Sequence, residues 1–145
     1  MKINRIDHIS VAVRNLKQGR ETWEPVLGKP GPDHTYVDER EKIRVARYWL
    51  GETAFELMES TAPDGDVARY IEKHGEGVMV VSLNVDHTRE AVDELAAKGY
   101  PFIPDSTGQV ARPFKDREFA FIHPRNMTGV LTELIDDNPR RPKGP

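Results

Sequence analysis

The sequence predicts an α+β protein made of two β-α-β-β-β modules in tandem, which form a cup-shaped mixed sheet with helices on its outside. The first observation is a repeat: residues 78–85 can be laid on residues 6–13 residue for residue, so that Ser82 falls on Ser10. The second is that a helical pattern follows each copy. The third is a Glu-Leu pair in the last strand of each module, at 56–57 and at 133–134. An internal repeat determines a fold prediction more strongly than the propensity of any single segment.

Length and composition predict one globular domain. The chain has 145 residues, of which 37% are hydrophobic and 31% charged. We expect the domain to span 1–138, with module one at 1–61, a linker helix within 62–75 and module two at 76–138, followed by a flexible tail at 139–145. The net charge of −3 gives no general attraction to nucleic acid.

The absence of cysteine excludes disulfides, thiolate metal sites and thiol nucleophiles. The amino-terminal segment lacks the apolar core of a signal peptide, and the chain contains no run of about 20 apolar residues that could span a membrane. We therefore expect a soluble cytoplasmic protein with no membrane partner.

The first strand, at 5–13, separates an apolar face from a polar one. Side chains alternate across a strand, so Ile9, Val11 and Val13 share one face while His8 and Ser10 share the other. A helix follows, with Asn15 as its N-cap, Leu16, Trp23 and Leu27 near helical spacing, and Pro25 and Gly28 at its end. Strands are predicted at 34–37, 42–50 and 53–58, the last two joined by a tight hairpin at Gly51-Glu52.

The second half repeats this order after a linker helix at 66–74 that Gly75 ends. After the strand at 78–85, Asp86 is predicted to cap a helix with Ala91 and Leu95 on its apolar face and Gly99 after its end. Strands follow at 102–103, 117–122 and 129–135. The segment 136–145 is charged and rich in proline, and we expect it to be too polar to pack.

Superposing the two modules places four residues at equivalent inner positions: His8 and Glu56 from module one, Val80 and Glu133 from module two. If the modules close around one cavity, a histidine and two carboxylates could hold a divalent cation such as Co²⁺, Mn²⁺ or Zn²⁺. Without a metal, burial and mutual repulsion would raise the pKa of at least one of the two carboxylates. Taken alone, His8 would be read as a hydrogen-bonded core histidine, and Glu59 as a surface residue.

Several stretches resemble the vicinal oxygen chelate superfamily (glyoxalase/bleomycin resistance/dioxygenase), and within it most resemble the methylmalonyl-CoA epimerases. They are Ile6-Asp-His-Ile, Leu50-Gly-Glu-Thr-Ala-Phe-Glu-Leu57, Gly75-Glu-Gly77, Phe121-Ile-His-Pro124 and Gly129-Val-Leu-Thr-Glu-Leu134. The resemblance implies a glyoxalase-like fold, a homodimer and a metal held by side chains at His8, Glu56, position 80 and Glu133. The third ligand should be histidine, where this sequence has Val80.

The resemblance also implies a mechanism, in which a metal binds the substrate oxygens and stabilises an enolate formed when a glutamate removes the α-proton. Glu133 is the candidate for one acid or base, and Glu41 lies in the region where the family's other one is expected. The prediction is an epimerase-like isomerase acting on methylmalonyl-CoA or a related acyl-CoA. The alternatives are a metal-free ligand-binding module of the bleomycin-resistance type and a glyoxalase-type isomerase or lyase.

Overall fold

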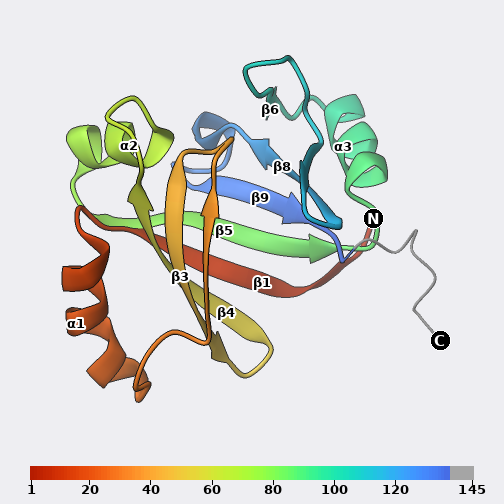
Figure 1. The fold of residues 1–145 in the computed structure, drawn as a ribbon. Helices are drawn as coiled ribbons and strands as arrows, with labels where there is room; N and C mark the ends of the chain where they lie inside the picture. Colours follow the sequence, from red (N-terminus) through yellow and green to blue (C-terminus); the bar gives the residue numbers. More distant parts are fainter. Residues whose placement is uncertain (138–145) are drawn as a thin grey trace. The chain divides into compact units, whose positions relative to one another are not determined.

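The computed structural model describes residues 1–137 and confirms the predicted α+β order of elements (Figure 1). The predicted flexible tail at 139–145 lies outside the described residues. No helix within residues 1–137 is both long enough and apolar enough to cross a membrane. The elements are β1 (Ile3–Ala12), α1 (Leu16–Leu27), β2 (His34–Asp38), β3 (Ile43–Leu50), β4 (Thr53–Ser60), α2 (Asp66–His74), β5 (Gly77–Val85), α3 (Thr88–Ala97), β6 (Phe102–Ile103), β7 (Arg112–Phe114), β8 (Arg117–Ile122), a 3₁₀ turn (Pro124–Asn126) and β9 (Leu131–Ile135).

The chain divides into two compact units. One is His8–Met79, and the other combines Met1–Asp7 with the described residues from Val80 to Asp137. In the first, the strand order is β2-β3-β4-β1, with β1 parallel to β4. In the second, it is β1-β5-β9-β8-β6, with β5 parallel to β9 and β7 added beside β8. Within the second unit, the start of β1 contacts the end of β5, where Asn4 Nδ2 donates to Asn84 Oδ1 at 3.0 Å.

The unit His8–Met79 buries one apolar face of its sheet against α1. Asn15 caps this helix as predicted, since its side chain accepts the N–H of Gln18 at 3.0 Å. Gly28 ends it in the left-handed conformation that glycine adopts most readily, at φ 68°. The core consists of Val11, Val13, Ala46, Tyr48 and Leu57, with Leu16, Trp23, Leu27 and Phe55 packed against them.

The second unit packs α3 on the apolar face of β5 and β9. Val85, Ala91 and Leu134 form its core, with Leu83, Leu95 and Phe102 against them. The predicted cap Asp86 is wrong: His87 occupies the N-cap position and its side chain makes no capping bond. The N–H of Thr88 instead donates to Asp136 Oδ2 at 2.9 Å. A residue 48 positions away in the sequence supplies the cap, so local spacing could not reveal it.

One further expectation for the second unit needs correction. Asp136, predicted to belong to the unpacked segment 136–145, is only 4% exposed and accepts hydrogen bonds from the N–H groups of Thr88 and Glu118. The structure also adds the short strand β7, for which the sequence analysis made no prediction. It pairs with β8 in the register Arg112 to Phe119.

Candidate functional site

The internal repeat extends to the strand registers. In module one, Ser10 of β1 lies opposite Glu56 of β4; in module two, Ser82 of β5 lies opposite Glu133 of β9. Both serines donate to their glutamates, Ser10 Oγ to Glu56 Oε1 at 3.1 Å and Ser82 Oγ to Glu133 Oε1 at 2.6 Å. All four residues are buried. Each module therefore has a glutamate opposite a serine at the same register position, as the repeat predicted.

Glu56 is the centre of a polar cluster on the face of its sheet that lies away from α1. Arg47 Nη1 donates to Oε2 at 2.5 Å, and the hydroxyl of Tyr36 donates to the same oxygen at 3.2 Å. His8 Nε2 lies 3.6 Å from Oε1, which also accepts the hydroxyl of Ser10. The cluster therefore draws one residue from each strand of the unit, with a second residue from β1.

These contacts determine the ionisation of Glu56. Burial opposes the charged carboxylate, but the electrostatic influence of His8 and Arg47 and the hydrogen bonds from Arg47 and Ser10 outweigh it, and the pKa of Glu56 is lowered from its ordinary value. Glu56 is thus not the carboxylate whose pKa the sequence-based argument expected to rise. His8 and Arg47 both lower this pKa, and the sequence-based argument did not include Arg47.

Arg47 and Tyr36 are the residues that sequence reasoning missed. A signal for Arg47 was present: a two-residue hairpin at Gly51-Glu52 pairs Leu50 with Thr53, and counting back along both strands brings Arg47 opposite Glu56. Tyr36 lies one strand further out, opposite Val45. Its contact with Glu56 depends on the register between β2 and β3, which the longer turn between these strands left open.

Glu133 has different neighbours in the second unit. The residue opposite it on β8 is Phe121, where module one has Arg47 opposite Glu56. The Phe121 ring in turn contacts a guanidinium, since Arg112 Cζ lies over it, 5.2 Å from its centroid. Arg112 Nη2 donates to the carbonyl oxygen of Ile103 at 2.8 Å. The face around Glu133 therefore combines a carboxylate, a hydroxyl and an aromatic ring.

The other predicted acid, Glu41, lies in the turn between β2 and β3, where its N–H donates to Asp38 Oδ1 at 3.1 Å. Just after this turn, Ile43 pairs with Ser60, four residues beyond Glu56 on β4. At about 3.3 Å per residue, the turn begins roughly 13 Å along the strand from the level of Glu56. A role for Glu41 in catalysis stays a prediction.

The donors do not fit a divalent cation well. Residues 1–137 contain no group of three His, Cys, Asp or Glu side chains that could hold a metal ion. Position 80 is the buried apolar Val80, two residues before Ser82 as His8 is two residues before Ser10. Both oxygens of Glu56 are already engaged, one of them by a guanidinium. The predicted ligand set of His8, Glu56 and Glu133 stays a prediction that these contacts do not support.

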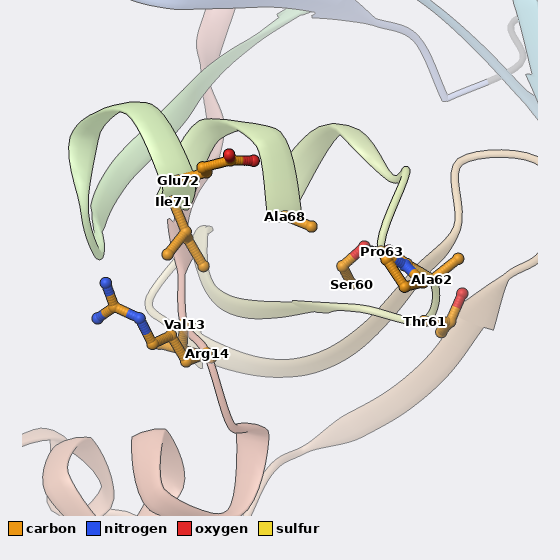
Figure 2. A pocket seen from close by; sticks show the side chains of 9 residues that line it. All are labelled: Val13, Arg14, Ser60, Thr61, Ala62, Pro63, Ala68, Ile71 and Glu72. Atoms are coloured by element: carbon orange, nitrogen blue, oxygen red, sulfur yellow. Dashed lines mark hydrogen bonds between the residues drawn. The ribbon is translucent and has the colours of Figure 1, made fainter.

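A separate pocket of about 460 Å³ lies beside α2 in the unit His8–Met79 (Figure 2). It does not include His8, Glu56 or the residues that contact them. The pocket therefore belongs to the linker helix and the end of β4 rather than to the polar cluster. Its lining consists of Val13, Arg14, Ser60, Thr61, Ala62, Pro63, Ala68, Ile71 and Glu72.

A repeated β-α-β-β-β unit with a buried Ser-Glu pair in each copy defines an α+β protein whose two modules share a common plan. Residues 7–121 match the Glyoxalase/Bleomycin resistance protein/Dioxygenase superfamily. This chain belongs to that superfamily, as its sequence motifs predicted.

Several known proteins are similar to almost the whole of this chain. The uncharacterized protein YqjC of Bacillus subtilis is 32% identical, over 98% of this chain and 95% of that protein. The mitochondrial methylmalonyl-CoA epimerase of Mus musculus is 29% identical, over 92% of this chain and 73% of that protein. The structure of a variant of Streptomyces coelicolor methylmalonyl-CoA epimerase in complex with 2-nitronate-propionyl-CoA has a TM-score of 0.83 and 27% identity, over 93% of this chain and 95% of that one. The predicted glyoxalase-like fold is therefore confirmed.

Proposed function

We propose that this protein is an epimerase-like enzyme that inverts the carbon next to the thioester of methylmalonyl-CoA or a related acyl-CoA. The observation that carries the proposal is the pair of buried glutamates at equivalent register positions, each hydrogen-bonded to a serine. The likeness in sequence and structure to methylmalonyl-CoA epimerases, one of them in complex with an acyl-CoA, supports the choice of substrate class.

The reaction needs one group to take a proton and a second group to return one. The bond between the α-carbon and its hydrogen breaks, the proton passes to a carboxylate, and the electron pair moves into the thioester carbonyl to give an enolate. Protonation of the opposite face completes the inversion. We assign Glu133 to one of these proton transfers because it is buried, accepts the hydroxyl of Ser82 and lies opposite the ring of Phe121. Glu41 remains the predicted partner acid.

The sequence-based prediction adds a divalent metal ion that would stabilise the enolate. The available donor groups do not support this metal ion. The proposal therefore consists of the proton transfers alone, and the experiment below tests whether a metal is needed. A homodimer and a cytoplasmic location, both predicted from the sequence, complete the proposal.

The test is deuterium uptake at the α-carbon of methylmalonyl-CoA in D₂O, first with chelator-treated protein and then with added Co²⁺. We expect uptake without metal. The variant Glu133→Gln should slow uptake by about 100-fold or more, because an amide cannot accept the proton. Glu59→Gln is the matched control, since Glu59 is paired with Arg44 outside the polar cluster. No uptake by the wild-type protein in either condition would refute the proposal.

A second candidate is a metal-free ligand-binding module. The apolar side chain at position 80 and the ion pair on Glu56 favour it, since both reduce metal binding. It predicts acyl-CoA binding without deuterium uptake, and an affinity that Glu133→Gln leaves nearly intact. The glyoxalase-type alternative is tested by turnover of a hemithioacetal.

A further inference from the structure

Arg47 stands beside the one glutamate of module one for which the family resemblance predicts a metal ion. We propose that the guanidinium of Arg47 takes the place of a divalent cation next to His8 and Glu56, so that this protein binds no divalent metal there. The inference deepens the proposed function and rests on it for its catalytic meaning, whereas the metal-binding claim stands on the contacts alone.

Three hydrogen bonds and the nearby imidazole of His8 crowd the acceptor positions of Glu56. A carboxylate has two oxygens with about four acceptor positions in total. Oε1 takes the hydroxyl of Ser10 and faces His8, while Oε2 takes the hydroxyl of Tyr36 and an N–H of Arg47. A cation could bind only after one of these groups had moved away.

The positive charge of Arg47 also opposes metal binding beside Glu56. The Arg47 side chain is 11% exposed and that of Glu56 is 2% exposed, so solvent screens the pair little. A guanidinium stays protonated at every physiological pH and cannot make way for a metal by losing a proton, as a histidine or lysine could. A divalent ion beside His8 would therefore meet a permanent positive charge at short range.

The position of the guanidinium is also constrained. Arg47 lies opposite Glu56 in the ladder between β3 and β4, and its Cζ atom lies over the Trp49 ring, 4.8 Å from the centroid. The strand register, the ion pair with Glu56 and the contact with the Trp49 ring therefore all restrict the position of the Arg47 side chain. A cation preorganised in this way stabilises negative charge that develops on a nearby oxygen without further rearrangement.

The same two strands offer a matched control. Arg44 lies opposite Glu59 and forms an ion pair with it. Side chains alternate across a strand, so this pair belongs to the other face of the sheet, where Glu59 Oε1 accepts the N–H of Leu16 at the start of α1. The Arg44 side chain is 51% exposed. The two arginines thus share strand, partner type and pairing geometry, and differ in burial and in the face they occupy.

The experiment is titration of chelator-treated protein with Mn²⁺, followed by the loss of the electron paramagnetic resonance signal of the free ion. We expect no stoichiometric binding for the wild-type protein or for Arg44→Gln. Arg47→Gln should bind one Mn²⁺ per chain, at least about tenfold more tightly than any residual binding by the wild-type protein, because a buried positive charge has been removed. Binding by Arg47→Gln should disappear when His8→Ala is added. Circular dichroism verifies that each variant is folded.

Two results would overturn the inference. One is a wild-type protein that binds one Mn²⁺ per chain and loses it on His8→Ala. The other is a folded Arg47→Gln variant that still binds none. If Arg47→Gln does not fold, the wild-type titration decides alone. Because Mn²⁺ binding is measured without substrate, a failure of this inference is distinct from a failure of deuterium uptake.

Discussion

The burial of an ion pair determines how much the pair contributes to the stability of this protein, as the two Arg/Glu pairs between β3 and β4 show. Arg44 and Glu59 are partly in water, where such a pair contributes about 0 to 1 kcal/mol. Arg47 and Glu56 are almost fully enclosed, so the loss of either partner leaves a buried charge without its counter-ion. The effect of replacing one of these residues on the free energy of unfolding therefore depends more on the face of the sheet that it occupies than on its residue type.

The lowered pKa of Glu56 predicts how stability depends on pH. A carboxyl that ionises more readily in the folded protein than in the unfolded chain stabilises the fold above its unfolded pKa, and this stabilisation is lost as the pH falls through the folded pKa. We expect the free energy of unfolding of the wild-type protein to decrease as the pH falls from about 5 to about 3. Urea unfolding at several pH values measures it.

Glu56→Gln should remove part of this pH dependence and lower the free energy of unfolding at neutral pH by about 3 kcal/mol, because Arg47 loses its counter-ion. Glu59→Gln is the control and should change stability by less than about 1 kcal/mol. Equal pH dependence in the wild-type protein and in Glu56→Gln would contradict the assignment.

At the scale of elements, the two main helices begin in different ways. α1 is capped by Asn15, the residue immediately before it, while the N–H of Thr88 at the start of α3 donates to Asp136, the residue immediately after β9. The first device is local and visible in the sequence. The second forms only when β9 and α3 have come together, so it links the helix to the folded unit.

Asn15→Ala should lower the free energy of unfolding by about 1 kcal/mol, since it removes the acceptor for the N–H of Gln18. Asn15→Asp keeps an acceptor at this position and should cost much less. Chemical denaturation of the three proteins gives the comparison. Equal losses for the two variants would show that the side-chain amide, rather than the capping bond, is what matters.

At the scale of the whole molecule, the two modules have the same plan with different polar groups. His8 lies opposite Ala54, two residues before the level of Glu56, and Val80 lies opposite Leu131, two residues before the level of Glu133. The two modules therefore share the strand registers, the serines and the glutamates, and the imidazole appears in one copy only. The position of His8 in one copy and Val80 in the other is the point at which this chain departs from the ligand set that the family resemblance predicts.

The sequence by itself determined the features that depend on short-range periodicity: alternating strand faces, the cap of α1, the hairpin at Gly51-Glu52, and the repeat that identifies Glu56 and Glu133 as equivalent. Tertiary structure alone decided the contacts between strands and segments far apart in the chain. Tyr36 of β2 reaches Glu56 of β4 past the intervening strand β3, and Asp136 caps a helix that begins 48 residues earlier. Such contacts follow from which strands pair and in what register, and this depends on burial of the whole apolar face rather than on any local pattern.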